Sequence, residues 1–150
     1  MTKNIIVVDA NVAVKMLHHE SDSEQARAFF KFCTVEGTRL LVPEHFLYEL
    51  VSVCQRVGVS VESVLDFFHA LKGSILTVVT SQKETWLQAE NIAQDGNKNS
   101  GFPSIYDSIY HALAIEAGGI FITADKRHFA KASQHEHITM LSEFYTSAFV

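Results

Sequence analysis

Near the start of the chain, residues 5–11 read IIVVDAN, so four β-favouring apolar residues run directly into an aspartate. A continuous apolar run of this kind is typical of a parallel strand that is buried on both faces. Residues 12–17 suit a helix, so Asp9 lies where a central strand ends and a helix begins. In open α/β sheets, ligands bind at that edge, beside the carboxyl ends of the strands. Asp9 is therefore either a helix cap or part of a site.

The length and composition of the chain limit what it can be. Its 150 residues predict a single domain over 1–150, large enough to bury a substantial core. The formal net charge of −5 argues against indiscriminate nucleic-acid binding through a basic coat, although it permits a local basic groove. No apolar run approaches the roughly 20 residues of a transmembrane helix. Cys33 and Cys54 fall at apolar positions of predicted helices, so we expect free, buried thiols in a cytoplasmic protein without membrane association.

Apolar spacing and turn signals divide the remaining chain into alternating strands and helices. Further strands are predicted at residues 39–42, 75–79, 120–123 and 138–141. Helices are predicted at residues 21–37, 43–58, 60–73, 104–118, 126–132 and 143–149, with another running from 81 to a loop at 95–103. Strands that alternate with helices predict an α/β fold, a three-layer α/β/α sandwich around a central, mainly parallel sheet.

Two of the predicted helix starts depend on particular residues. Pro43 suits a first helical position, because proline has no N–H to lose there and its φ angle is already helical. Ser81 and Glu84 have the spacing of a capping box, in which each side chain bonds the backbone N–H of the other residue.

Four acidic residues fall at comparable places in this arrangement. Asp9 and Asp125 follow predicted buried strands, Asp107 lies in the first turn of a helix, and Glu49 lies inside another helix. Taken singly, each has an ordinary structural explanation as a helix cap or a partly exposed helix residue. Together, carboxylates that converge on one edge of a sheet repel one another unless a cation or protons intervene. Oxygen ligands suit Mg²⁺ or Mn²⁺, whereas no cluster of cysteine and histidine offers zinc a site.

Four motifs occur in order along the chain. They are VVDAN at 7–11, VP followed by Glu49 at 42–49, YDSIYHALA at 106–114 and ITAD at 122–125. In this combination the sequence resembles the PIN-domain nucleases, and within them it is most similar to the VapC-type toxins of toxin–antitoxin pairs. The resemblance covers nearly the whole chain.

The resemblance implies a set of site residues and partners. The acidic metal-site and catalytic residues would be Asp9, Glu49, Asp107 and Asp125, binding Mg²⁺ or Mn²⁺, and Asn11 and Thr123 would help shape the site. The protein would be a homodimeric endoribonuclease with RNA as its substrate and an antitoxin protein as its partner. A carboxylate-held ion suits phosphodiester hydrolysis, because it lowers the pKa of a bound water and neutralises charge in the transition state.

Several side chains near these acids have two interpretations each. His111, one helical turn after Asp107, faces either the site or the core. Cations that flank the acidic segments either contact RNA phosphates or are ordinary surface charges: Lys15, Lys98, Lys126, Arg127 and Lys131. A set of phenylalanines either packs in the core or forms a groove for an antitoxin helix or strand: Phe29, Phe30, Phe32, Phe67 and Phe68. Unpaired RNA is favoured over duplex, because sequence-specific recognition mostly targets unpaired bases.

Two other classes of function stay open. The first is an acid-pocket phosphatase or receiver-like domain with Asp9 as nucleophile. Haloacid-dehalogenase-type phosphatases carry a second aspartate two residues later, where this chain has Asn11. The second is a non-catalytic PIN-like module that only binds RNA, and the presence of all four acids argues against it.

Overall fold

The computed structural model describes residues 5–144 of the chain. Within these residues, five strands form one sheet in the order β3-β2-β1-β4-β5, and every neighbouring pair is parallel. The strands are β1 (Ile5–Val8), β2 (Arg39–Pro43), β3 (Leu76–Val79), β4 (Ile120–Thr123) and β5 (Ile138–Met140). The predicted three-layer α/β/α class is confirmed, and the sheet is parallel throughout.

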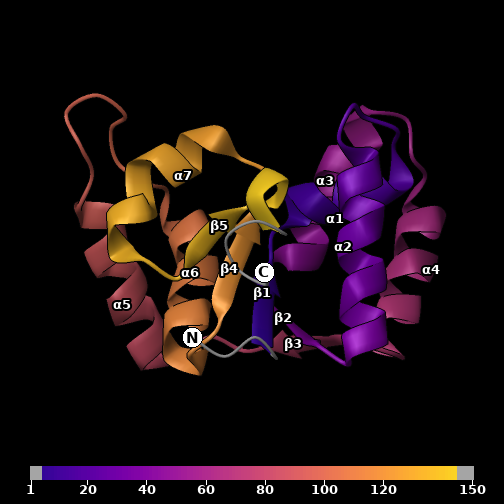
Figure 1. Ribbon diagram of the computed structural model, residues 1–150, viewed down its shortest axis with the longest axis horizontal. Coiled ribbons are helices and arrows are strands. Elements are labelled where there is room, and N and C mark those ends of the chain that lie inside the picture. The colour runs from indigo at the N-terminus through magenta and orange to yellow at the C-terminus, as the bar shows by residue number, and fades with distance from the viewer. Residues whose placement is uncertain (1–4, 145–150) are drawn as a thin grey trace.

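Helices cover both faces of the sheet. The α-helices are α1 (Ala10–Leu17), α2 (Ser23–Glu36), α3 (Phe46–Arg56), α4 (Val61–Lys72), α5 (Lys83–Gln94), α6 (Ile105–Ala117) and α7 (Lys126–Ala132). Two short 3₁₀ turns, η1 (Ser133–His135) and η2 (Leu141–Glu143), flank β5. Figure 1 shows α1 to α4 on one side of the sheet and α5 to α7 on the other. No helix in residues 5–144 combines the length and apolar character needed to cross a membrane.

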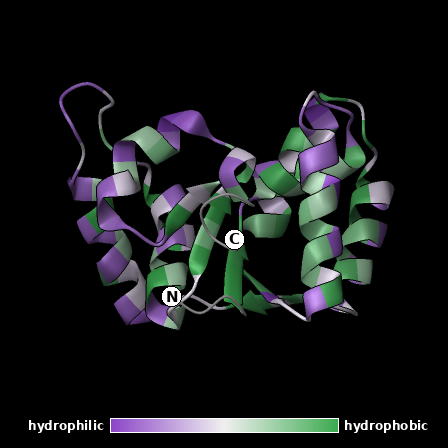
Figure 2. Ribbon diagram, viewed as in Figure 1, coloured by the Kyte–Doolittle hydropathy of each residue, from purple (hydrophilic) through white to green (hydrophobic). Residues whose placement is uncertain are grey.

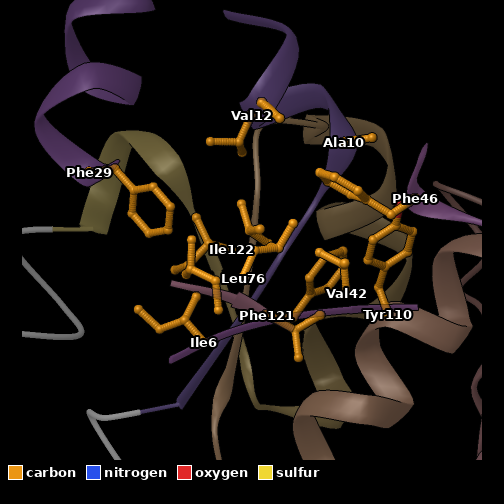
Figure 3. Close-up of a cluster of buried hydrophobic side chains, with 14 of the residues drawn as sticks. Ile6, Ala10, Val12, Phe29, Val42, Phe46, Leu76, Tyr110, Phe121 and Ile122 are labelled. Carbon is orange, nitrogen blue, oxygen red and sulfur yellow. The ribbon is translucent and has the colours of Figure 1, made fainter. Parts of the chain in front are cut away.

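The apolar core surrounds β1 and β4. Ile6, Val7 and Val8 of β1 are fully buried, which explains their continuous β-branched run: both faces of a central parallel strand meet helices. In Figure 2 the strands are mainly hydrophobic, whereas the helices are striped with polar residues. Figure 3 shows this buried cluster, with Phe29 of α2 and Tyr110 of α6 on opposite sides of the strands.

The order of the strands creates a switch point between β1 and β4. The chain steps from β1 to β2 to β3 in one direction, returns across the sheet through α5 and α6, and then steps from β4 to β5 in the other direction. Because connections leave these two neighbours on opposite faces, a crevice opens at their carboxyl ends, where ligands bind in such sheets. Asp9 follows β1 there, and Asp125 lies two residues after the end of β4.

Three sequence predictions differ from the structure or fall outside it. Pro43 does not open a helix: it ends β2, paired with Val79, and α3 begins at Phe46. Its fixed φ angle is also compatible with extended backbone, and its missing N–H matters little where the strand ladder stops. The predicted helix at 143–149 lies largely outside the described residues.

The capping box predicted at Ser81 is wrong by one residue. The N-cap of α5 is Gln82, whose backbone N–H donates to Oγ1 of Thr85 at 3.2 Å. Ser81 bonds instead to Glu44, which accepts hydrogen bonds from its backbone N–H at 3.1 Å and its hydroxyl at 3.2 Å. A carboxylate 37 residues away therefore outcompetes the local cap that the spacing indicated.

Candidate active site

Asp9 is the most buried of the predicted site acids, with 3% of its surface exposed. It is the N-cap of α1, and its backbone N–H donates to the carbonyl of Ile122 at 3.0 Å, which joins the end of β1 to β4. Its Oδ2 accepts a hydrogen bond from the Thr123 hydroxyl at 2.9 Å. Its Oδ1 accepts a longer one, 3.4 Å, from the backbone N–H of Asn11. Asp9 is thus a helix cap and also an oriented, desolvated carboxyl.

Thr123 and Asn11 form a polar bridge between the ends of the two strands. Oγ1 of Thr123 accepts hydrogen bonds from the backbone N–H of Asp125 at 3.1 Å and from Nδ2 of Asn11 at 3.4 Å. Oδ1 of Asn11 in turn accepts from the backbone N–H of Ala124 at 3.1 Å. Because this network fixes the backbone on both sides of the crevice, it sets the spacing of Asp9 and Asp125.

The other three acids lie around the same crevice, at the starts of three helices. Asp125 caps α7, and its Oδ1 accepts from the backbone N–H groups of Arg127 at 2.9 Å and His128 at 3.2 Å. Asp107 lies in the first turn of α6 and Glu49 in the first turn of α3. Their side chains remain 30% and 34% exposed, so they keep room to move.

The four carboxyl groups influence one another electrostatically. Burial, aided by the charges of Asp107 and Glu49 and opposed by the Thr123 hydrogen bond, raises the pKa of Asp9 to about 8. Burial likewise raises the pKa of Asp107; the charges of Glu49 and Asp125 add to this rise, and nearby His128 opposes it. The structure therefore brings the predicted acids into one electrostatic field with an excess of negative charge.

The chemistry of this donor set fits a hard divalent cation, although the carboxylates are too far apart in the structure to bind one together. All four predicted ligands are carboxylates, and oxygen ligands are what Mg²⁺ and Mn²⁺ prefer. Among residues 5–144, no three His, Cys, Asp or Glu side chains lie close enough together to hold a metal ion as they stand. Binding an ion through this set therefore requires the carboxylates to move closer together, and Glu49 and Asp107 are partly exposed and have room to do so.

A groove runs alongside two of the acids, between α3 and the start of α6. It encloses about 500 Å³. Its lining residues are His45, Tyr48, Glu49, Ser52, Val53, Arg56, Ser104, Tyr106 and Asp107. Glu49 and Asp107 are thus open to a ligand from this side.

A family model described as "PIN domain" matches residues 6–134 of the sequence. The chain belongs to the PIN domain family. No curated protein matches this sequence. The resemblance noted from the four sequence motifs is therefore confirmed at the level of the family.

Solved structures share the fold of this PIN domain at low sequence identity. DNA-bound VapBC from Salmonella typhimurium is 17% identical over 94% of this chain and 99% of its own, with a TM-score of 0.68. A toxin–antitoxin complex from Klebsiella pneumoniae is 12% identical over 91% of this chain and 97% of its own, with a TM-score of 0.64. Mycobacterium tuberculosis VapC20, a toxin that cleaves the sarcin–ricin loop, is 13% identical over 75% and 83%, with a TM-score of 0.60.

Two histidines of the PIN domain contact the acids and were missed from the sequence. Nε2 of His45 lies 3.1 Å from Oε1 of Glu49, and Nδ1 of His128 lies 3.9 Å from Oδ2 of Asp107. Burial alone would lower the pKa of His45, but Glu49 raises it above its ordinary value. The spacing of four residues between His45 and Glu49 is a helical signal that could have been found. The approach of His128 to Asp107 arises only from tertiary packing.

The structure decides between the two interpretations for some of the side chains near the acids. His111 is fully buried in α6, and its Nε2 bonds the carbonyl of Glu136 at 2.5 Å, so it faces the core and not the acids. Lys15 has two acidic partners, Asp22 at 2.9 Å and Glu20 at 3.3 Å, which makes it part of the scaffold.

The phenylalanines of this set all pack in or against the main core. Phe29, Phe30 and Phe68 are buried, while Phe32 and Phe67 are partly buried. They do not form an open groove, so core packing accounts for them.

Proposed function

We propose that this PIN domain is a metal-dependent endoribonuclease and the toxin of a type II toxin–antitoxin pair. The observation that carries the proposal is the acidic cluster at the switch point of the sheet, where burial and neighbouring charges raise the pKa of Asp9 to about 8. Burying one carboxyl group among three others is electrostatically unfavourable and lowers the stability of the folded protein. A bound cation relieves that destabilisation, and clusters of this kind are found where function needs them.

The proposed metal-site and catalytic residues are Asp9, Glu49, Asp107 and Asp125. A bound Mg²⁺ or Mn²⁺ supplies an activated water and neutralises charge on the phosphate in the transition state. Within the chain, Thr123 and Asn11 hold Asp9 at a fixed position and leave its Oδ1 only weakly bonded. Asp125 keeps Oδ2 available, because its backbone donors both bond to Oδ1. Oδ2 of Asp125 can therefore face an ion, and Oδ1 of Asp9 can do so by keeping or giving up its long bond from Asn11.

The phosphatase and receiver-like alternatives fit the site less well. A nucleophilic Asp9 would have to approach a phosphorus atom, but it is nearly inaccessible and capped by two donors. Asn11 stands where a phosphatase needs a second acid, and its amide is already bonded to Thr123 and Ala124.

The proposed partners follow from the proteins that share the fold. VapBC and a toxin–antitoxin complex are among them, and VapC20 is a toxin that cleaves the sarcin–ricin loop. We therefore propose RNA as substrate, an antitoxin as binding partner and a homodimer as assembly.

A cleavage assay tests the enzymatic part of the proposal. The purified protein should cut RNA with Mg²⁺ or Mn²⁺ and not with EDTA. Asp9→Asn and Glu49→Gln should each lose on the order of a hundredfold in rate, as expected when a group that stabilises transition-state charge is removed. Glu90→Gln, a matched change on the exposed face of α5, should leave the rate unchanged. Equal cleavage by all four proteins would indicate a contaminating nuclease and refute the site.

A further inference from the structure

Two exposed tyrosines stand next to the acids of the groove. Tyr48 directly precedes Glu49 and is 78% exposed, and Tyr106 directly precedes Asp107 and is 62% exposed. Both line the groove between α3 and the start of α6. Large aromatic side chains left in solvent on one groove are typical of binding surfaces, because their apolar faces have no partner within the fold.

The remaining lining of the groove suits a nucleic-acid strand. Arg56, two turns after Glu49 on α3, is exposed and has no acidic partner among residues 5–144. The exposed Ser52 lies between Glu49 and Arg56 along the groove and carries a hydroxyl that donates or accepts. A guanidinium can contact a phosphate bidentately. The groove therefore offers two rings for bases and one cation for the backbone.

The position of Tyr106 is fixed by the chain around it. Nε2 of His45 lies 3.1 Å from the carbonyl oxygen of Tyr106, and the His45 ring meets the Tyr106 ring edge-on, with centroids 5.8 Å apart. The same His45 nitrogen lies 3.1 Å from Glu49. One imidazole thus couples the exposed ring to an acid of the cluster, so a base held by Tyr106 has a defined place relative to those acids.

We infer that the groove is a subsite for single-stranded RNA, in which bases stack on Tyr48 and Tyr106 and Arg56 contacts the backbone. This inference rests on the proposed function and names the form of its substrate. An acidic centre repels phosphate, so affinity must come from uncharged contacts and from cations at its margin. Stacking supplies such contacts for any base, since every base has a π-face. A duplex is excluded because its base faces are covered by their neighbours in the helix.

Fluorescence anisotropy in EDTA tests binding apart from cleavage. The probes are labelled ten-nucleotide oligoadenylate and oligouridylate, each alone and annealed together as a duplex. We expect the single strands to bind and the duplex to bind far more weakly. Tyr48→Ala and Tyr106→Ala should each weaken single-strand binding about tenfold, within the range measured for loss of one stacked base. Tyr48→Phe and Tyr106→Phe should bind like the wild type, because the ring is retained.

Two further variants separate the contribution of the Arg56 charge from that of the two groove tyrosines. Arg56→Gln should reduce the slope of log affinity against log salt by about 0.7, the value for one lost phosphate contact on a single strand. Trp86→Ala, which removes an exposed aromatic ring outside the groove, should change nothing. Circular dichroism melts of each variant should match the wild type, since the substituted side chains are exposed.

The outcomes of the two assays are distinguishable. Ring-dependent binding without metal-dependent cleavage would support the subsite and refute the proposed enzyme. Cleavage by the wild type with unchanged binding by both alanine variants would refute the subsite and leave the enzyme. Analytical ultracentrifugation of the same variants gives a further outcome. If the wild type sediments as a dimer and the alanine variants sediment as monomers with intact RNA binding, the groove is an interface between two copies and the inference is overturned. Equal affinity for the duplex would overturn it as well.

Discussion

The hydroxyl of Thr123 donates a 2.9 Å hydrogen bond to Oδ2 of Asp9, a residue 114 positions earlier in the chain. The hydroxyl oxygen of Thr123 also accepts a hydrogen bond from the backbone N–H of Asp125. One buried hydroxyl at the end of β4 thus joins two acids of the proposed site. In physical terms, the parallel pairing of β1 with β4 sets this contact, because it brings both strand ends to one level.

Thr123→Val tests how much this hydroxyl contributes. The change keeps the shape of the side chain but leaves Oδ2 of Asp9 and the N–H of Asp125 without their partner. We expect a loss of about 1–3 kcal/mol in the free energy of unfolding, the usual cost of unsatisfied buried groups, measured by urea denaturation. Cleavage should fall at least tenfold, because the acids lose their fixed positions.

Thr139→Val is the matched control for that experiment. Thr139 is a buried threonine on β5, and its side chain has no hydrogen bond to the other residues that the structure describes. Thr139→Val should lower the free energy of unfolding by less than about 1 kcal/mol and leave cleavage unchanged. If the two variants behave alike, the bond from Thr123 to Asp9 has no special role.

The buried His111 should make stability fall in acid. Burial, opposed by the bond to Glu136 and aided by neighbouring histidines, lowers the pKa of His111 to about 4 from an ordinary value near 6.5. Between these values the unfolded chain binds more protons than the folded one, so stability rises with pH there and is lost as pH falls from 6.5 to 4. His111→Gln should remove a pH-dependent contribution of up to about 3 kcal/mol across this window, measured by chemical denaturation at each pH.

An exposed histidine provides the control for the acid measurement. His69 lies on the outer face of α4, and His69→Gln should leave the pH dependence as it is in the wild type. If His111→Gln also leaves the slope unchanged, His111 accepts protons in the folded state and the assigned cause is wrong.

Asp9 should have the opposite effect at higher pH. Its folded pKa of about 8 lies above the ordinary 3.8, so the folded state binds more protons between these values and stability falls as pH rises through them. Above pH 6.5 the contribution of His111 to stability no longer changes with pH. The effect of Asp9 is therefore measured most clearly between pH 6.5 and 8. In EDTA, the wild type should lose stability across this window relative to Asp9→Asn. A constant difference between the two proteins would show that Asp9 titrates lower.

The parts of the fold that were predictable from the sequence are those encoded by local patterns. The run at 5–8 and the run at 120–123 are apolar because both faces are covered, and the aspartates after them cap helices. Ser104 has the spacing of an N-cap, and its hydroxyl does accept the backbone N–H of Asp107. These short-range rules placed Asp9, Asp107 and Asp125 at the start of a helix or just after a strand. Glu49 was expected inside a helix, and it lies in the first turn because α3 begins at Phe46.

The parts that were missed depend on contacts between distant segments. Ser81 bonds Glu44 in place of a local cap, and Pro43 continues a strand because β3 pairs beside it. The exposure of Tyr48 also could not be read from spacing. Its neighbours on α3 include both core and surface positions, and only the placement of α6 makes its surroundings a groove. Local propensity cannot report which of two competing partners the folded chain selects.

Metal binding should couple the acidic cluster to stability, and Asp9→Asn is the variant that tests it. Without an ion, a desolvated Asp9 among three other carboxyls destabilises the fold at neutral pH, so its neutral analogue should melt at or above the temperature of the metal-free wild type. Mg²⁺ should raise the wild-type melting temperature, because an ion that binds only the folded state contributes RT ln(1 + [L]/Kd), about 2.7 kcal/mol at a hundredfold excess over Kd. The variant, short of one ligand, should gain much less. Thermal scans of both proteins in EDTA and in Mg²⁺ decide the matter: a metal-free variant clearly less stable than the wild type would make Asp9 mainly a helix cap, and equal shifts with Mg²⁺ would mean that the ion does not bind through Asp9.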